Sequence, residues 1–380
     1  MKRSNKLVRA RRGNIIVLSA VLMVIMMAMI AFAVDLGYVY NARTELQRAA
    51  DASAIAACWE LIDEDAVKGT SNSSVITSDA RSKARQFVAL NKITQAAANL
   101  ADEDITVGYI ASPGNPSSPF LTSGYSGAPN AVKLRIRRTT QQNGGVPLFF
   151  GRVLGVSFAT MESEATAAYL PGLSGFKAPG DGTNLGILPY ALDQGTWDAM
   201  LAGTGGSDSY NFAESNGSVS AGSDGIREVN LFPQGTGSPG NRGTVDIGGA
   251  NNSTSDIARQ ILQGISPQDM AQMPDGKLQF DSNGKLYLNG DTGISAGVKD
   301  ELASIIGETR IIPIFSSVTG NGNNAVYTIV KFCGIRVMYV KLTGSNKQVL
   351  VQPAVCVTKG GIQSTSFNSN FVFSPVWLVR

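Results

Sequence analysis

The chain has 380 residues, of which 43% are hydrophobic and 16% are charged, and it contains 3 cysteines and no histidine. The lack of histidine excludes an imidazole base, a histidine metal ligand and a Ser-His-Asp triad. The net charge of +3 hides an asymmetry, because residues 1–34 carry 6 of the 32 basic side chains and no acidic one. Residues 35–380 therefore hold 26 basic against 29 acidic side chains, which argues against a nucleic-acid partner.

An uncharged stretch near the N-terminus has the length of a membrane span. The residues from Asn14 to Val34 carry no charge, and as a helix they would extend roughly 30 Å, the thickness of a bilayer core. The segment before them is wholly basic and the segment after them begins with Asp35, so the positive-inside rule predicts a cytoplasmic tail at residues 1–13 and export of the rest. The basic residues that would fix this orientation are Lys2, Arg3, Lys6, Arg9, Arg11 and Arg12. The alternative is a cleaved secretory signal, although its apolar core is usually only ~7–15 residues long.

The helical pattern continues beyond the apolar stretch. Helix-forming residues without proline and apolar side chains at helical spacing predict one helix from Asn14 to about Glu60. Its outer half carries a stripe of small residues, which allow another helix to approach closely. The stripe consists of Ala49, Ala50, Ala52, Ala54, Ala56 and Ala57. Packing on the chain's own globular part and packing on another molecule both fit this pattern.

Three segments within the first 170 residues form a specific signature. They are Arg12-Gly13 with Ala33 to Gly37 around the apolar stretch, Leu46 to Ala57 beyond it, and Val146 to Val156 followed by Ala165 to Ala167. In these segments the chain resembles the TadE/TadG-like proteins of tight-adherence (Flp-type) pilus assembly systems. The resemblance implies partners at the inner membrane, namely the pilin, the pilus-assembly platform proteins and other TadE-like components.

Two features found in members of this family are missing. Pilin-like members are processed after a glycine with glutamate at the fifth following position, whereas Leu18 occupies that position after Gly13. Some TadG-like proteins carry a von Willebrand-type domain with an Asp-x-Ser-x-Ser metal motif, which this sequence lacks. We therefore expect no prepilin-type cleavage and no such metal site.

After a polar linker, the sequence predicts a second helix and a small antiparallel sheet. The helix is expected from an N-cap at Ser78 to about Leu100, and β-type patterns follow at Ile105–Ile110, Ala131–Thr139 and Val156–Leu170. This order is typical of a pilin-like α+β arrangement. Residues 35–170 are accordingly assigned to a TadG-like, pilin-like region.

A hinge at Pro171 to Gly175 precedes a shift toward Gly, Asn, Ser and Thr. Residues 171–380 are therefore predicted to form a β-rich periplasmic or surface domain, so that the fold class is α+β: a long N-terminal transmembrane and projecting helix, a small antiparallel sheet and this exported domain. Its regular elements are expected as helices at Ser255–Gln263 and Val298–Ile306, a hairpin across Asp281 to Gly284, and strands at Arg310–Phe315, Ala325–Leu342 and Lys347–Thr358.

The three cysteines differ in what the sequence predicts for them. Two consecutive β-rich runs carry Cys333 and Cys356, and if Leu342 lies opposite Gln348, the two cysteines come within one residue of facing each other. A structural disulfide between them is expected in an oxidising periplasm, with two buried thiols as the alternative. Cys58 lies on the long helix, where a buried thiol is favoured over an intermolecular bridge.

The motifs that suggest catalysis lack their chemical context. Gly293 to Gly297 match the G-x-S-x-G pattern, whose serine needs a histidine base. Gly235 to Gly240 match G-x-G-x-x-G, but loop and strand residues follow instead of a helix. We expect no catalytic residue, no cofactor and no metal ligand.

The sequence therefore predicts a non-enzymatic, membrane-anchored component of Flp-type pilus assembly, either a scaffold or a minor pilin-like subunit that supports surface adhesion. Self-association through the N-terminal helix is a further expectation. The alternative is a membrane-anchored periplasmic ligand-binding module or enzyme unrelated to pili.

Overall fold

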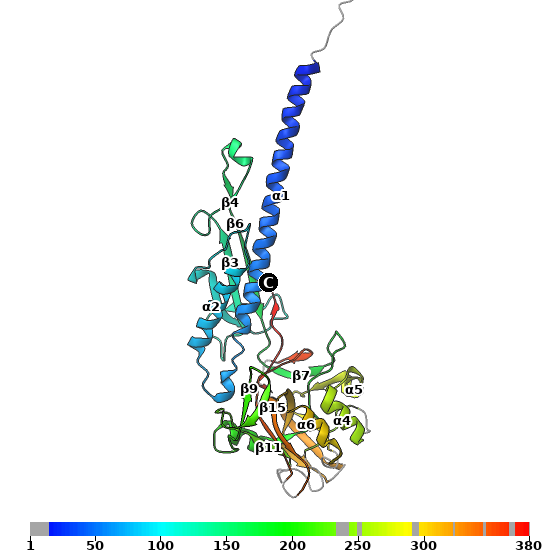
Figure 1. Cartoon of the computed structure of the whole chain (residues 1–380). Helices are drawn as coiled ribbons and strands as arrows, with labels where there is room; N and C mark the ends of the chain where they lie inside the picture. Colours follow the sequence, from blue (N-terminus) through cyan, green and yellow to red (C-terminus); the bar gives the residue numbers. More distant parts are fainter. Residues whose placement is uncertain are drawn as a thin grey trace, which may run out of the picture. The chain divides into compact units, whose positions relative to one another are not determined.

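The structure is a computed structural model. It describes residues 15–232, 243–248, 253–290, 296–321, 324–344, 347–364 and 369–379. A long N-terminal helix followed by a β-rich part with several sheets makes the fold α+β, as predicted (Figure 1).

The chain forms two compact units that alternate along the sequence. The first comprises the described residues up to Ser53, Ala84–Ile105 and Leu134–Ala165, and the second Ala54–Lys83, Thr106–Lys133 and the described residues from Thr166 onward. The domain boundary expected at Pro171 stays a prediction.

Helix α1 runs without interruption from Ile15 to Trp59, which confirms the single long helix expected from the sequence. It contains no proline, and its residues are mainly strong helix formers. The remaining helices are α2 (Ser73–Leu90), α3 (Gln194–Leu201), α4 (Thr254–Gln263), α5 (Pro267–Gln272) and α6 (Lys299–Ser304).

Helix α2 differs from its prediction at both ends. It begins at Ser73, ahead of the expected N-cap Ser78, after a turn in which Oδ1 of Asn72 accepts a hydrogen bond from the backbone N–H of Ser74 at 3.0 Å. It ends at Leu90 and not near Leu100. The reason is a tight turn soon after, because Thr94 and Gln95 both have positive φ, at 49° and 67°, which an α-helix does not contain.

A five-stranded sheet has the order β2-β1-β3-β6-β21. Its strands are β1 (Ile105–Ile110), β2 (Phe120–Leu121), β3 (Ala131–Arg138), β6 (Met161–Ala168) and β21 (Trp377–Leu378). Buried and partly exposed residues alternate along β3, as in a sheet with one face on the core. The last strand comes from the end of the chain, where Trp377 pairs antiparallel with Ala168.

A buried carboxylate organises one end of this sheet. Asp104, which is 2% exposed, lies 2.6 Å from the Arg137 guanidinium and 3.6 Å from that of Arg135. The side-chain amide of Gln142 donates to the same carboxylate at 2.7 Å. The hydrogen bond to Asp104 raises the pKa of Arg137, so this group stays charged at every accessible pH.

The larger sheet is built around one strand. β15 (Val326–Lys341) pairs antiparallel with β14 (Thr309–Thr319) and β16 (Gln348–Pro353), and the path β11-β16-β15-β14-β8 is joined by β13 and β19, which both pair with β15. The accompanying strands are β8 (Leu192–Asp193), β11 (Val229–Phe232), β13 (Leu286–Asn289) and β19 (Ser369–Asn370).

Two hydrophobic cores cover the two faces of the larger sheet. Along β14, Ile312 belongs to one core and its neighbour Ile311 to the other, as the period of two in a strand requires. The first core also takes Trp197 from α3, Ile261 from α4 and Leu302 from α6, so helices cover that face. Most residues of both cores are almost completely buried, and these cores hold the second unit together.

The hairpin expected across Asp281 to Gly284 is wrong. The backbone N–H of Asp281 donates to the carbonyl of Lys285, so the chain does turn there. However, β12 (Lys277–Gln279) pairs with β7 (Leu173–Lys177), whereas β13 pairs with β15, and the turn joins two different sheets. The other short strands are β4 (Val146–Pro147), β5 (Phe158–Ala159), β9 (Tyr210–Ala213), β10 (Ser218–Ala221), β17 (Cys356–Val357), β18 (Gly361–Gln363) and β20 (Val372–Phe373).

Candidate functional site

The first half of α1 is apolar and exposed. Among the described residues, nothing buries any part of its most apolar stretch, and large side chains such as Ile16 and Leu18 are exposed. Water disfavours so much exposed apolar surface, whereas a run of about 20 apolar residues matches a bilayer core. By length and composition, this helix can serve as a membrane anchor.

The second half of α1 is buried in the protein itself. Ala42, Leu46, Ala49 and Ala50 are fully buried in the first unit, and Ala54 and Ala57 are fully buried in the second. The alternative in which the alanine stripe packs on the chain's own globular part is therefore the one that the structure shows. Five of its six alanines are buried, and Ala52 is partly exposed.

Between these two halves lies Asp35, the first charged residue after the apolar stretch. Its carboxylate accepts hydrogen bonds from the backbone N–H groups of Phe149 at 2.8 Å, Phe150 at 3.0 Å and Gly151 at 2.7 Å. The side chain is 7% exposed, and three donors from consecutive residues satisfy the charge that burial would otherwise leave without solvation. We call this set of contacts the Asp35 clamp.

The clamp positions a short hairpin beside α1. Strands β4 and β5 pair through Val146 with Ala159, and the 3-10 helix η3 (Gly151–Leu154) lies between them. The ring of Phe149 also meets that of Tyr38 on α1 edge to face, with centroids 5.2 Å apart. In Figure 1, the hairpin that contains β4 lies alongside the blue helix.

The sequence contained both partners of the clamp without indicating the contact. From the sequence, Asp35 is only a flanking charge of the apolar stretch, and Val146 to Val156 are only part of a family signature. The sequence signal that joins them is weak: a lone acidic residue at the end of an apolar helix, and a Phe-Phe-Gly sequence at a turn.

The six basic residues expected to orient the anchor, Lys2 to Arg12, lie outside the described residues.

The predicted disulfide is not present, because the structure holds Cys333, Cys356 and Cys58 as buried free thiols. β16 ends at Pro353, and Cys356 belongs to β17, where it pairs with Val372 instead of continuing the hairpin with β15.

The physical reason is that the two cysteines point into different cores. Cys333 belongs to the core on one face of the large sheet, and Cys356 belongs to the core on the other. Burial raises the pKa of the Cys356 thiol to about 11 and raises that of Cys333 well above its ordinary value. Both sulfurs therefore act as small core groups and stay protonated at neutral pH.

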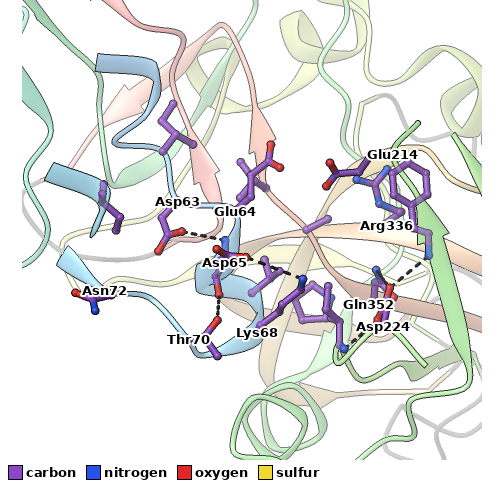
Figure 2. Close-up of a pocket in the computed structure, with 18 of the residues that line it drawn as sticks. Asp63, Glu64, Asp65, Lys68, Thr70, Asn72, Glu214, Asp224, Arg336 and Gln352 are labelled. Atoms are coloured by element: carbon purple, nitrogen blue, oxygen red, sulfur yellow. Dashed lines mark hydrogen bonds and ion pairs between the residues drawn. The ribbon is translucent and has the colours of Figure 1, made fainter. Parts of the chain in front are cut away.

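The second unit contains a cavity of about 920 Å³, shown in Figure 2. Its lining is mainly acidic, with two basic residues, Lys68 and Arg336. The carboxylates are those of Glu60, Asp63, Glu64, Asp65, Asp79, Glu214 and Asp224.

Several of the polar groups in this cavity are engaged locally. The carboxylate of Asp63 accepts from the backbone N–H of Asp65 at 2.9 Å, and that of Asp224 accepts from the N–H of Ile226 at 2.9 Å. The Arg336 guanidinium lies 3.4 Å from the centroid of the Phe212 ring and donates to the carbonyl of Gly307 at 2.6 Å. Burial lowers the pKa of Arg336. These contacts hold turns and strands in place.

No group of three or more acidic or cysteine side chains able to hold a metal ion occurs among the described residues. Two sequences, Ser174 to Lys177 and Ser282 to Lys285, match the spacing of a Ser-Lys catalytic pair, but neither serine lies on a helix that would aim it. Ser174 lies on strand β7, where its hydroxyl donates to the carbonyl of Gln363 at 3.1 Å, and Ser282 lies in the turn after Asp281. We take the membrane-type helix α1 and the Asp35 clamp as the candidate functional site.

Comparison with known protein families gives two matches, both in the N-terminal part. The Flp pilus-assembly TadE/G-like family matches residues 13–66, and the Tad-like Flp pilus-assembly family matches residues 56–167. No curated protein and no solved structure gives a match. The resemblance seen in the sequence is therefore confirmed over residues 13–167, which contain α1 and both partners of the Asp35 clamp.

Proposed function

We propose that this chain, a protein related to Flp pilus assembly by its residues 13–167, is a single-pass inner-membrane scaffold of the assembly machinery. Residues 1–13 lie in the cytoplasm, α1 crosses the membrane, and residues 35–380 are exported. The role is non-enzymatic. The protein contacts the pilin, the assembly platform or other TadE-like components.

The observation that carries this proposal is the division of α1 into an exposed apolar half and a buried half. The buried half is fixed in the folded protein through fully buried residues such as Leu46 and Ala50. The exposed half is the part of the helix that no other described residue covers, and its length and composition match a bilayer. The whole helix lies within the matched region.

A scaffold is favoured over a filament subunit by the sequence around Gly13. Leu18 stands where the processed pilin-like members carry glutamate, which supports retention of the basic tail and the anchor. The basic tail supplies the asymmetry that orients the helix, since Lys and Arg flank the cytoplasmic end of membrane spans.

Fractionation of cells tests the role. Surface filaments are sheared off, and the inner membrane and the sheared material are examined by blot and intact mass. We expect the protein at full length in the inner membrane. Recovery in the sheared filaments with a shortened N-terminus would instead identify a minor pilin-like subunit.

Cysteine labelling tests the orientation. The native cysteines are buried, so a membrane-impermeant maleimide in spheroplasts reports on single introduced sites. Leu90→Cys, at a position 69% exposed in the exported part, should be labelled, and Ser4→Cys should be labelled only after lysis. Labelling of Ser4→Cys in intact spheroplasts would refute the orientation.

A further inference from the structure

We propose that residues 148–158, here called the apolar loop, insert into the outer boundary of the same bilayer that α1 crosses. The occupant of this surface is lipid, at the level where headgroups meet acyl chains. The inference rests on the proposed function in one respect, namely that α1 is a membrane anchor.

The apolar loop exposes large apolar side chains. Val153 is 85% exposed and Leu154 82% exposed, and they form the tip in the 3-10 helix η3. Four further apolar side chains of the loop are exposed by 44–60%, namely Phe149, Phe150, Val156 and Phe158. Contiguous exposed apolar surface of this kind marks interaction sites, because water disfavours it.

The position of the loop is fixed relative to the apolar half of α1. Asp35, the first charged residue after the membrane-type stretch, is bonded to the N–H groups of Phe149, Phe150 and Gly151. Asp35 marks the point at which the helix leaves the bilayer core. The loop therefore begins at the membrane surface, and this placement depends only on contacts within the first unit.

The charge pattern of the loop favours lipid over a protein partner. Residues 144–160 contain no acidic side chain, and Arg152 is their only charged one. Segments that lie in a membrane interface combine Phe and Leu on the apolar side with basic residues that attract anionic headgroups. The first acidic residue beyond the loop is Glu162, at the far side of β5.

The fold of the loop keeps these side chains outward. A Cβ atom at Gly151 would lie 2.8 Å from both Cδ1 of Leu148 and the carbonyl oxygen of Val156, so the turn closes tightly on itself only with glycine there. Gly155 follows with φ of 85°, a left-handed conformation that favours glycine. The apolar tip is thus built into the turn.

Depth-dependent fluorescence quenching tests the proposal with the full chain. The protein is reconstituted in vesicles of phosphatidylcholine and phosphatidylglycerol, with and without a phosphatidylcholine that carries a nitroxide on its acyl chain. A single NBD label is placed at Val153→Cys or, as an independent second site, at Leu154→Cys. Leu90→Cys is the matched control, because Leu90 is also an exposed apolar position of the first unit but lies farther from the expected membrane surface. Leu90 is close in sequence to Thr94, whose N–H donates to the Glu45 carboxylate on α1. Glu45 lies about 15 Å along α1 from Asp35.

We expect a blue-shifted emission and severalfold stronger nitroxide quenching at positions 153 and 154 than at position 90. Equal, weak quenching at all three positions would show that the loop lies in water and would overturn the proposal. A blue shift at 153 and 154 without nitroxide quenching would also overturn it, because a protein surface would then cover the loop.

A label at Val24→Cys, in the apolar half of α1, separates this proposal from the proposed function. Quenching at position 24 without quenching at 153 and 154 refutes only the insertion of the loop. Absence of quenching at position 24 refutes the membrane anchor itself.

Discussion

Replacing Asp35 by asparagine should loosen the apolar loop from α1. The substitution keeps the size of the side chain and removes its charge. In asparagine one carboxylate oxygen is replaced by an NH2 group, which cannot accept a hydrogen bond, so the remaining oxygen can still accept from Phe150 and Gly151 but not from Phe149. A hydrogen bond to a charged group contributes about 1.5–3 kcal/mol and one to a neutral group about 0.5–1.5 kcal/mol, so each retained bond loses roughly 1 kcal/mol. Because the freed N–H of Phe149 lies at the edge of the protein and can bond water, we expect about 2 kcal/mol in total, or about thirtyfold in the opening equilibrium.

Hydrogen exchange measured by mass spectrometry on the full chain in vesicles checks this value. Peptides that cover residues 146–158 should exchange about thirtyfold faster in Asp35→Asn, while peptides from β15 in the second unit should be unchanged. Asp51→Asn is the matched control, since it lies on the same helix and its carboxylate accepts from the exposed side chain of Gln47 at 2.8 Å. The reasoning fails if exchange in residues 146–158 is unchanged in Asp35→Asn, or if Asp51→Asn accelerates it equally.

Three further predictions concern stability and titration. Without reductant, alkylation of the denatured chain should add three adducts, one for each free thiol. The native chain should react slowly, because its thiols are buried and the pKa of Cys356 is raised to about 11. Finding one adduct after denaturation would reveal a disulfide. Ala42→Leu should lower the free energy of unfolding by about 1–3 kcal/mol in thermal or denaturant unfolding, because Ala42 is fully buried and has no room for a larger side chain. Arg43→Leu, at the neighbouring exposed position, is the control and should have little effect. Equal effects of the two substitutions would contradict the packing described. The hydrogen bond from Lys359 is the main cause that lowers the pKa of Asp181 in the folded state. Ionised Asp181 therefore contributes to stability above about pH 3.9, the pKa of an unperturbed aspartate, and this contribution is lost as the pH falls toward the folded-state pKa. Lys359→Met should raise that pKa in an NMR titration, and an unchanged value would show that the pair is not formed.

The sequence predicted the helices and strands whose patterns are strong and local. The end of α1 was predicted within one residue of Trp59, because an uninterrupted apolar run and the helix formers after it need no information from elsewhere in the chain; the predicted start at Asn14 lies outside the described residues. α2 was extended too far, since the turn at Thr94 and Gln95 is fixed by contacts such as the hydrogen bond from the Thr94 N–H to the Glu45 carboxylate. Local helix propensity does not contain that bond.

The pairing of strands was likewise predictable only where the strands are neighbours in the sequence. The β15–β16 hairpin was anticipated, with Lys341 and not Leu342 opposite Gln348. The disulfide inferred from that register failed for two reasons. β16 ends at Pro353, and the two cysteines face different cores, which a count along two strands does not reveal.

By itself the sequence determined that the chain carries a membrane-type helix, that this helix continues into the folded part, and that its first 170 residues resemble Flp pilus-assembly proteins. These properties depend on composition and on spacing between near neighbours. Only the tertiary structure decided that the alanine stripe packs on the chain's own folded part and that the thiols of Cys333 and Cys356 point into different cores. It also decided that Asp35 binds the N–H groups of residues 149–151. The contacts of Asp35 join residues more than a hundred positions apart, and they form only when packing of the unit brings a charged side chain and unpaired backbone donors to the same place.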